Sequence, residues 1–374
     1  MMKNVLFLAH SGSAGGAEYC LDTTLRFLDR EKIEPYVIFP WEGPMVESAR
    51  KMGIPVEICR LNWWFWYRPS GWEWKNRLRI PWYVGHLARR IRQKRIETVY
   101  SNTACLFEGA LAARLAGVPH VTHIHEVLEE RFLEPRWFSL PWMVRFFYRW
   151  SRWVVYESKE SAEIGRKWLR DDSLFDAKTR VVSNSCRFLL PENHYRKRSP
   201  KAKKRILWVG TFSERKNPGM LVEALRRLKC REDWDALLVG AGPLEMELRT
   251  KIAGYGLESR CSVWPFQEEI LPVLEEGDFL VLTSQEESFG LVLVEAGMLG
   301  LPVIATRTQG PTEIVEEGTQ GFLVEPEDDR NLAEKITFLL EQDEKRREWG
   351  ENFRNKILEK YHPAKNTAQL MDLL

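Results

Sequence analysis

Residues 287–296 read Glu287-Ser288-Phe289-Gly290-Leu291-Val292-Leu293-Val294-Glu295-Ala296 and directly follow the apolar run Phe279 to Leu282. The run 278–283 predicts a strand buried on both faces, 284–290 a loop and 292–299 a helix. This is the β-loop-α unit of a parallel sheet. Ligands of such sheets bind outside the carboxyl ends of the strands, where the next helix offers unpaired N–H groups to an anion. Glu287 and Glu295 therefore flank a predicted phosphate site.

Two carboxylates eight residues apart beside an anion site need a reason, because carboxylates repel phosphate. A ligand that is part phosphate and part polyol, such as a sugar nucleotide, supplies one. Glu295, in the helix, can accept hydrogen bonds from ribose hydroxyls. Glu287, in the loop, can bind a sugar hydroxyl or stabilise positive charge developing on a sugar ring. The alternative is that both are solvated acids near a helix start, where negative charge is mildly favourable.

Apolar runs of strand length alternate with amphipathic helical stretches through most of the chain, which predicts an α/β fold. The first series of predicted strands comprises 5–9, 36–39, 98–101, 120–123 and 153–156, and the second comprises 205–209, 236–239, 262–264, 279–282, 302–305 and 321–324. Leu190 to Arg205, with two prolines and a basic group, is the predicted linker. We therefore expect two Rossmann-like, doubly wound domains, 1–189 and 190–360, facing a cleft that holds a shared ligand site.

Composition narrows the class of protein. At 374 residues with 44% apolar residues, the chain suits two globular domains. The formal charge of +2 conceals an early basic region, from Arg60 to Arg95, and a more acidic C-terminal half. The six cysteines form no Cys-x-x-Cys pair, so neither a metal cage nor a disulfide framework is expected. The first apolar run is short and leads into glycines, and no run is long enough to span a bilayer, so we expect a cytoplasmic protein without a signal peptide.

The segment from His10 to Glu18 contains Gly12, Gly15 and Gly16, follows the first predicted strand and opens a helix. Glycine at this point lets the backbone approach a ligand closely. The segment does not match G-x-G-x-x-G, and no acidic residue ends the second strand to bind a ribose, which disfavours a dinucleotide dehydrogenase. The alternative is a tight turn whose glycines serve packing.

His123 and His125 lie at the end of a predicted strand, with alternating side chains on one face. An imidazole at this edge can reach a ligand. Zinc is the competing interpretation, but no third and fourth ligands stand at a recognisable spacing, so substrate contact by His125 is favoured and no metal is predicted.

Gly210 to Asn217 repeats the strand-then-glycine arrangement, with Arg215 and Lys216 available to neutralise a diphosphate. Asp233-Trp234-Asp235 precedes its strand instead of ending it, so this acidic pair is interpreted as surface and implies no metal.

Tryptophans and other aromatic residues are interleaved with basic residues in two stretches, 63–83 and 137–153. Such faces suit a membrane interface with anionic lipids, which is the favoured interpretation. Buried core aromatics are the second, and nucleic-acid stacking is the least favoured, so no nucleic-acid partner is expected.

These segments together resemble the retaining GT-B glycosyltransferases called family 4. The resemblance covers nearly the whole chain and rests on the glutamate pair of residues 287–296 and on the segments that surround it. These segments are Gly15-Gly16-Ala17-Glu18, His125-Glu126, Val182-Ser183-Asn184, Gly300-Leu301-Pro302-Val303-Ile304-Ala305, Gly310-Pro311-Thr312-Glu313-Ile314-Val315 and Gly321-Phe322-Leu323-Val324.

The resemblance implies roles for individual residues. Glu295 would hold the donor ribose, Glu287 would contact the transferred sugar, and Lys216 would face the diphosphate. Backbone amides from Ser288 and Phe289 through Gly290 to Leu291 would meet phosphate or sugar, and the glycine loops at Gly15, Gly16 and Gly210 would line the ligand. The family usually has arginine directly after the glycine of the second-domain loop. Thr211 stands there in this chain, and Arg215 is the candidate replacement.

The resemblance also implies the activity, a metal-independent transfer of a hexosyl or N-acetylhexosaminyl group with retention of configuration. The donor would be a nucleotide-diphosphate sugar and the acceptor a glycan or lipid-linked hydroxyl, in surface polysaccharide or glycolipid synthesis. The aromatic-basic stretches add the expectation that the protein works at the inner face of a membrane. Residues 1–189 would bind the acceptor, 190–360 the donor, and the last helix, about 361–374, would cross back onto the first domain. The alternatives are a sugar-nucleotide epimerase and a non-catalytic glycan or lipid binder.

Overall fold

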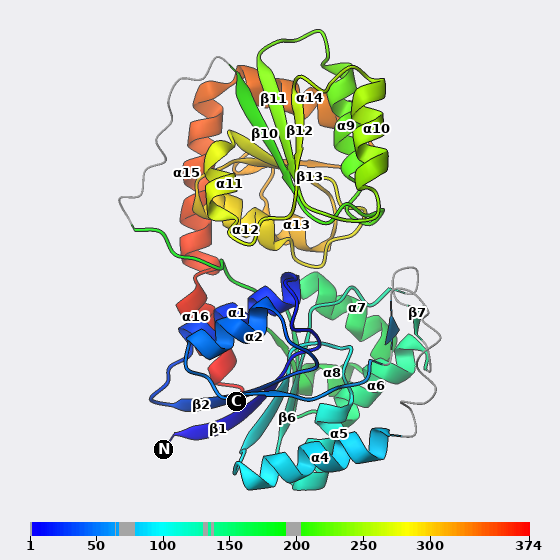
Figure 1. Ribbon diagram of the computed structural model, residues 1–374, viewed down its shortest axis with the longest axis vertical. Coiled ribbons are helices and arrows are strands. Elements are labelled where there is room, and N and C mark those ends of the chain that lie inside the picture. The colour runs from blue at the N-terminus through cyan, green and yellow to red at the C-terminus, as the bar shows by residue number, and fades with distance from the viewer. Residues whose placement is uncertain (1, 64, 67–78, 130–133, 136–137, 192–202) are drawn as a thin grey trace. The chain divides into compact units, whose positions relative to one another are not determined.

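The computed structural model describes residues 2–63, 65–66, 79–129, 134–135, 138–191 and 203–374. The chain forms two compact units (Figure 1). The N-terminal unit comprises residues 1–187 together with 363–374, and the C-terminal unit comprises 188–362. We describe each unit by itself.

The N-terminal unit is built on a parallel sheet with the strand order β3-β2-β1-β5-β6-β8-β9. Its strands are β1 (Lys3–Leu8), β2 (Ile33–Phe39), β3 (Val56–Ile58), β5 (Thr98–Ser101), β6 (His120–Ile124), β8 (Trp153–Tyr156) and β9 (Thr179–Val181). The central strands are buried on both faces, as their continuous apolar sequences require. The order reverses between β1 and β5, so this is a doubly wound sheet.

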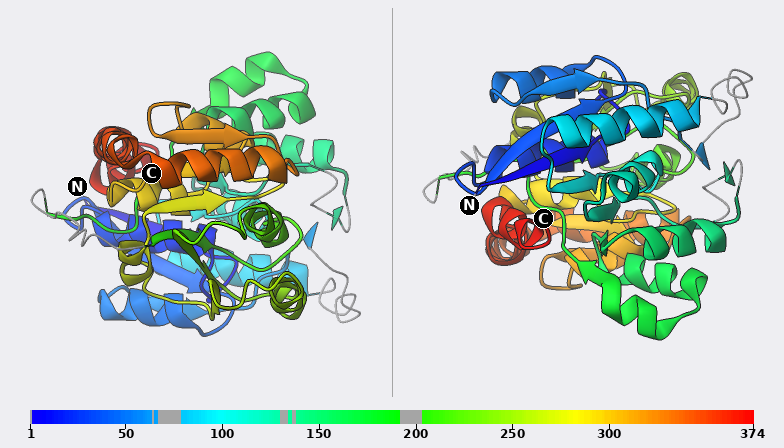
Figure 2. Two further views of the ribbon diagram at one scale, coloured as in Figure 1. Left: turned by 90° about the horizontal axis from the view of Figure 1, so that it is seen from above. Right: turned by 90° about the horizontal axis from the view of Figure 1, so that it is seen from below.

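Helices cover both faces of this sheet (Figure 2). Val5 and Phe7 of β1 share a core with helices α1, α2 and α16, whereas Leu6 and Leu8 of the same strand face a core that includes α4 and α5. The helices of the unit are α1 (Gly16–Phe27), α2 (Pro44–Lys51), α4 (Ile80–Gln93), α5 (Glu108–Ala116), α6 (Leu140–Trp150), α7 (Lys159–Leu169), α8 (Asp172–Lys178) and α16 (Pro363–Met371).

Helix α16 belongs to the N-terminal unit although its residues follow the whole C-terminal unit in the sequence (Figure 1). Leu370 and Leu374 are buried in the core beside α1. The hydroxyl of Thr98 donates to the carbonyl of Leu374 at 2.9 Å. The helix is therefore an integral layer of the unit.

The C-terminal unit repeats the architecture with a parallel sheet in the order β12-β11-β10-β13-β14-β15. Its strands are β10 (Lys204–Val209), β11 (Trp234–Val239), β12 (Cys261–Trp264), β13 (Phe279–Leu282), β14 (Val303–Thr306) and β15 (Gly321–Val324). The order reverses between β10 and β13, which makes this sheet doubly wound as well. The two sheets match the α/β fold with two doubly wound domains that the alternation of the sequence predicts.

Helices α9, α10 and α14 share a core around the buried rings of Trp208 and Trp234. Helix α12 packs against α15, where a Cβ on Gly297 would lie 2.7 Å from the side chain of Ile357. The helices of the unit are α9 (Pro218–Arg227), α10 (Glu245–Gly254), α11 (Leu271–Glu276), α12 (Leu291–Met298), α13 (Gln309–Ile314), α14 (Asp329–Glu341) and α15 (Asp343–Lys360).

Two short strands, β4 (Phe65–Trp66) and β7 (Glu134–Pro135), pair antiparallel apart from the main sheets. The sequence reasoning predicted neither of them, nor β3 and β9, because each has only two or three residues. In the part of the chain that the structure describes, no helix has both the length and the apolar character needed to cross a bilayer.

Candidate active site

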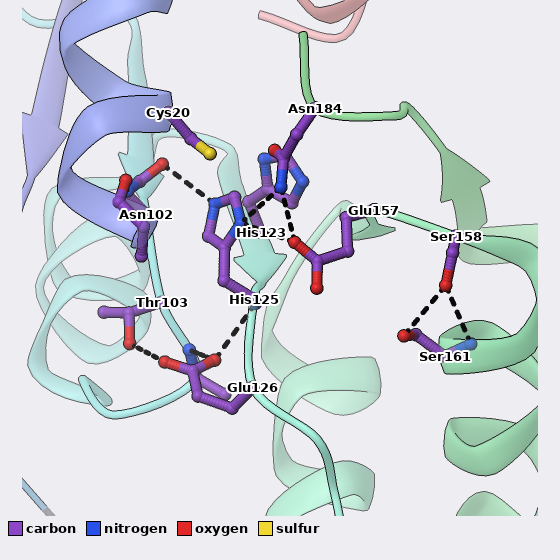
Figure 3. A network of polar contacts seen from close by, with 12 residues as sticks. Cys20, Asn102, Thr103, His123, His125, Glu126, Glu157, Ser158, Ser161 and Asn184 are labelled. Atoms are coloured by element: carbon purple, nitrogen blue, oxygen red, sulfur yellow. Dashed lines mark hydrogen bonds and ion pairs between the residues drawn. The ribbon is translucent and has the colours of Figure 1, made fainter. Parts of the chain in front are cut away.

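In the N-terminal unit, polar side chains gather beyond the carboxyl ends of four consecutive strands (Figure 3). Asn102 follows β5, His125 follows β6, Glu157 follows β8 and Asn184 comes shortly after β9. The cluster begins next to the point where the strand order reverses, which is where doubly wound sheets bind ligands.

His125 is held by contacts on both sides of its ring. Its Nδ1 lies 3.1 Å from Oε2 of Glu157, and its Nε2 lies 3.2 Å from Oδ1 of Asn102. The Asn102 amide nitrogen donates to the carbonyl of Ala17 at 2.7 Å, which turns its oxygen towards the histidine. Both ring nitrogens thus contact polar side chains of the protein. The ring is therefore fixed in orientation.

Glu157 receives a second hydrogen bond, from the side-chain amide of Asn184 at 2.5 Å. The backbone at Asn184 is in turn held from α16, where Asn366 donates its side-chain amide to the carbonyls of Ser183 at 2.9 Å and Asn184 at 3.4 Å. The last helix thus positions a residue that orients the partner of His125.

The acid next to His125 in the sequence does not contact the histidine ring. Glu126 accepts hydrogen bonds from the hydroxyl of Thr103, from the amide of Ala104 at 2.9 Å and from the amide of His125 at 3.1 Å (Figure 3). These contacts tie the loop after β6 to the loop after β5. Glu126 therefore shapes the backbone of the site.

His123 lies beneath His125, with ring centroids 4.1 Å apart. Its Nδ1 is 2.6 Å from the hydroxyl of Tyr100, and burial together with the neighbouring His125 lowers the pKa of His123 well below its usual value. It is therefore a neutral core side chain. Among the residues that the structure describes, no group of three His, Cys, Asp or Glu side chains is placed to hold a metal ion.

The first glycine loop leads from β1 into α1. Gly15 is the N-cap of the helix and Gly16 its first residue. A Cβ on Gly15 would lie 2.5 Å from Oε2 of Glu18, and the other carboxylate oxygen of Glu18 is 3.0 Å from Nε2 of His10. A Cβ on Gly16 would meet no atom of the described residues within 4 Å. Packing within the protein therefore does not require glycine at residue 16.

In the C-terminal unit, the loops that follow the adjacent strands β10 and β13 meet at the corresponding reversal point. Lys216, from the first loop, forms an ion pair with Oε2 of Glu287, from the second. Ser284 donates to the same oxygen at 3.1 Å. Burial by itself would raise the pKa of Glu287, but Lys216 and Arg215 outweigh it and hold the pKa below its usual value. The carboxylate is ionised.

The backbone of the two loops is also joined. Arg215 donates from Nη1 to the carbonyl of Glu286 at 3.2 Å and accepts at its own carbonyl from the amide of Gln285 at 2.8 Å. Gly210, after β10, has its carbonyl against Gly240, where a Cβ would lie only 1.8 Å away. Arg215 and Lys216 are thus both set at the carboxyl edge of this sheet, whereas Thr211 is exposed.

Helix α12 begins directly after Gly290, one residue before the predicted start, and Gly290 adopts a positive φ of 93° as N-cap. Such a backbone favours glycine. The amide of Gly310 donates to the carbonyl of Glu287 at 2.9 Å, and a Cβ there would lie 2.1 Å from the carbonyl oxygen of Phe289. The loop is therefore clamped from the start of α13.

The predicted residues around this helix differ in exposure. Phe289 is buried and its ring packs edge-on against Tyr361, with centroids 5.8 Å apart. Glu295 is 2% exposed within the apolar α12, and Ser288 and Leu291 are half-buried. A buried carboxylate in an apolar helix is uncommon and marks a position with a specific partner.

Asn102, Glu157, Ser284 and the clamp at Gly310 were not singled out by the sequence reasoning. Asn102 and Glu157 directly follow strands, and Ser284 comes two residues after one. A polar residue just beyond a buried apolar run is the sequence pattern that could have identified them. The clamp of Gly310 onto the Phe289 loop is a contact between distant segments, and only the folded chain reveals it.

The aromatic residues of the two aromatic-basic stretches divide between core and surface. Tyr83, Phe147 and Tyr148 are buried, whereas Trp82 is 63% and Trp142 43% exposed. Other members of the stretches, including Trp64, Tyr67, Trp72, Trp74 and Trp137, lie outside the described residues.

Comparison with known families matches both halves of the chain. The family model described as glycosyl transferases group 1 matches residues 191–356, and the model described as glycosyltransferase family 4 matches residues 14–186.

Individual relatives agree with these matches. The chain is 30% identical over 168 residues to the N-acetyl-alpha-D-glucosaminyl L-malate synthase of Bacillus anthracis, covering 45% of this chain and 44% of the relative. It is 35% identical over 149 residues to the amylovoran biosynthesis glycosyltransferase AmsK of Erwinia amylovora, covering 37% and 36%. The alignments thus span less than half the length of these curated relatives.

Solved structures are similar over the whole chain. The crystal structure of HepE from Anabaena in complex with UDP and glucose superposes with a TM-score of 0.80 at 26% identity, covering 100% of this chain and 99% of HepE. TarM of S. aureus superposes with a TM-score of 0.79 at 13% identity, which supports the fold alone.

Proposed function

The chain belongs to the group 1 glycosyltransferases with the GT-B fold, and from that premise we propose that it transfers a sugar from a nucleotide-diphosphate sugar to a hydroxyl of a glycan or lipid-linked acceptor, with retention of configuration. The observation that carries the proposal is the buried pair of Lys216 and Glu287 at the strand reversal of the C-terminal unit. In this pair, a cation that can bind phosphate lies beside a carboxylate that can bind a sugar.

The donor belongs to the C-terminal unit in this proposal. Lys216 and Arg215 neutralise the diphosphate, and the amides at the start of α12 add donors and the positive end of the helix dipole. Glu295 accepts from the ribose hydroxyls, and Glu287 contacts the hydroxyls of the transferred sugar. Each role matches a residue that is buried or half-buried at the carboxyl edge of the sheet.

In the reaction, the bond between the anomeric carbon and the diphosphate oxygen breaks while the acceptor oxygen bonds to the same face of that carbon. The acceptor proton passes to the departing phosphate oxygen, because that oxygen lies on the side of attack. The residues act mainly through charge: Lys216 and Arg215 stabilise the leaving diphosphate, and Glu287 the positive charge on the sugar ring. No metal is needed for these roles.

In this proposal His125 contacts the acceptor or the donor sugar from the N-terminal unit. Its ring is oriented by Glu157 and Asn102, and its side chain is nearly buried. A polar side chain that is already held in place stabilises charge in a transition state without reorganising.

We test the donor first by thermal shift with UDP-, GDP- and ADP-sugars, because a ligand that binds only the folded state raises the melting temperature by mass action. HepE was solved with UDP and with UDP-glucose, so UDP-glucose is the first donor in the panel. A shift with one nucleotide class that disappears in Glu295→Ala supports the proposal. A shift that survives Glu295→Ala and Lys216→Ala together contradicts the assigned site.

We further propose that the enzyme works as a peripheral protein at the inner face of a membrane. Phe138 and Trp142 are exposed and stack with their ring centroids 3.9 Å apart at the start of α6, and Trp82 is exposed at the start of α4. The segment 79–95 holds six basic residues and no acidic one. Exposed aromatic rings beside basic residues suit anionic lipid headgroups.

A further inference from the structure

Three aromatic rings meet beyond one end of the sheet in the N-terminal unit, apart from the His125 network. Their centroids are 5.4 Å apart for His10 and Trp63 and 5.9 Å apart for Trp41 and Trp63. They come from separate segments: His10 follows β1, Trp41 follows β2, and Trp63 comes after β3. Trp41 leaves 40% of its surface open to solvent.

Hydrogen bonds at the ring edges hold the two indoles. Nε1 of Trp63 donates to the carbonyl of His10 at 3.1 Å, and Nε1 of Trp41 donates to the hydroxyl of Ser13 at 3.4 Å. Because both indole N–H groups already have partners within the protein, what Trp41 offers a ligand is the apolar, π-electron face of its ring.

Close backbone contacts of Gly12 and Gly43 fix the backbone around Trp41. A Cβ on Gly12 would lie 2.2 Å from the carbonyl oxygen of Trp41, and a Cβ on Gly43 would lie 2.2 Å from that of Gly12. The amide of Met45 also donates to the carbonyl of Gly12 at 3.1 Å. The loop that carries Trp41 therefore rests directly on the glycine loop after β1.

The position of the rings relates them to the candidate active site. Strand β1 is paired with β2 on one side and with β5 on the other. Trp41, His10 and Asn102 therefore follow three consecutive strands, which lie about 4.8 Å apart in a sheet. Asn102 contacts His125. The rings thus extend the same edge of the sheet away from His125, within one unit.

We propose that Trp41, supported by Trp63, is a stacking platform for a pyranose ring of the acceptor, one residue or more removed from the hydroxyl that reacts. A pyranose has an apolar face of C–H groups and an edge of hydroxyls, which is what an aromatic ring with polar groups around it binds. The surroundings supply those polar groups, since Ser13 is exposed and Glu42 and Arg50 form an exposed ion pair at 2.8 Å. This assignment rests on the proposed function and specifies a saccharide acceptor.

The test uses ligand-observed saturation-transfer NMR on the full chain with methyl glycosides of glucose, galactose, mannose, rhamnose and N-acetylglucosamine. The expected result is saturation of the ring C–H protons on one face of at least one glycoside. Trp41→Ala should abolish this signal, whereas Trp41→Phe, which keeps an aromatic face, should retain part of it. Leu115→Ala removes another exposed apolar side chain of the same unit and should change nothing. Wild-type protein that saturates no glycoside, or Trp41→Ala that keeps the signal, overturns the proposal.

Donor measurements separate this proposal from the proposed function. Trp41→Ala should keep the wild-type thermal shift with the donor. With an acceptor oligosaccharide in hand, its KM should rise about tenfold or more while kcat changes less, because a truncated aromatic anchor typically costs that much binding. If no donor raises the melting temperature of the wild type, the result would count against the proposed function. A normal donor shift without glycoside binding would count against the platform alone.

Discussion

Lys216 and Glu287 form an ion pair between two loops that follow adjacent strands, β10 and β13, where the strand order of the C-terminal unit reverses. The sequence reasoning gave these residues separate partners, the diphosphate and the transferred sugar. Under our proposal, a donor phosphate must compete with Glu287 for Lys216, or share it. The pair holds both loops in place before any ligand arrives.

The coupling between these two residues can be measured. Lys216→Ala should lower the free energy of unfolding by about 3–5 kcal/mol, because it leaves a buried carboxylate without its cation. The double variant Lys216→Ala/Glu287→Ala should lose less than the sum of the two single variants. Lys204→Ala, which breaks the more exposed pair with Asp343, should cost no more than about 1 kcal/mol. Urea unfolding gives all four values, and simple additivity would show that the pair is not coupled.

His125 and its orienting acid should affect transfer more than folding. His125→Ala should lower kcat/KM about 100-fold or more, because it removes a polar side chain held in place for substrate contact. Glu157→Gln should lower it less, since the amide still occupies the space but no longer offers a carboxylate to Nδ1. His86→Ala, at a half-buried ion pair with Glu57, is the control. Initial rates with the identified donor, beside melting curves, check this; equal loss in rate from all three variants would contradict it.

Substituting Gly16 can distinguish a glycine needed for close approach of a ligand from a glycine needed for packing. Alanine at this position meets open space and needs no positive φ. Gly16→Ala should therefore keep or raise stability by about 0.5–1 kcal/mol, since alanine loses less backbone entropy on folding. If the loop lies against a ligand, the same variant should bind that ligand more weakly. A variant that is as stable and as active as the wild type would remove Gly16 from the site.

Glu108 should make stability depend on pH. Burial raises the pKa of Glu108 to about 7. Its Oε1 accepts two hydrogen bonds from Asn62, at 2.8 Å and 2.9 Å, and no partner of Oε2 is found among the described residues. The folded state then holds a proton that the unfolded state releases at lower pH. Stability should fall as pH rises from about 4.5 to 7, by up to about 3 kcal/mol.

Glu108→Gln isolates this contribution, because glutamine does not titrate. Glutamine also brings a new buried N–H group, whose cost does not change with pH, so the quantity compared is the slope of stability with pH and not the absolute stability. The difference in melting temperature, variant minus wild type, should increase between pH 5 and pH 8. Parallel curves for the two proteins across that range would show that Glu108 does not titrate in the window.

Membrane association depends on the exposed rings of α4 and α6 in our proposal. The wild type should float with vesicles that contain phosphatidylglycerol and stay behind with phosphatidylcholine alone. Phe138→Ala/Trp142→Ala should weaken flotation about tenfold or more, because each buried aromatic ring contributes more than 1 kcal/mol. Met246→Ala, 75% exposed in the other unit, should float normally. If all variants float equally well, or if the wild type does not float, these rings do not bind a membrane.

The sequence predicts most of the fold because the strands are continuous apolar runs. Strand β13 (Phe279–Leu282) lies within the run 278–283 that was predicted as a strand, and α12 begins one residue before its predicted start because Gly290 caps it. Strand β9 was missed because Thr179 to Val181 is too short for a periodic pattern. The residue types and their positions after predicted strands identified His125, Lys216 and Glu287 as candidate site residues. The residues that they contact depend on tertiary structure.

Those contacts cannot be found from spacing. Glu157 lies 32 residues from His125 in the sequence and reaches it only because β6 and β8 are neighbours in the sheet. The acid beside His125 in sequence, Glu126, looks like the natural partner and instead binds the loop at Thr103. Adjacency along the chain was a poor guide here because consecutive side chains beyond a strand point in different directions.

Because α16 comes last in the sequence but packs in the N-terminal unit, that unit is the last to be completed during synthesis. Residues 188–362 form a contiguous unit, so the C-terminal unit can close as soon as the ribosome has released it. The N-terminal unit is translated first but lacks a packed helix, and the hydrogen bonds from Asn366 that hold Ser183 and Asn184, until that helix emerges. A nascent chain that stalls after residue 362 would therefore carry a finished C-terminal unit and an unfinished N-terminal unit, with the apolar face that α16 covers open to chaperones.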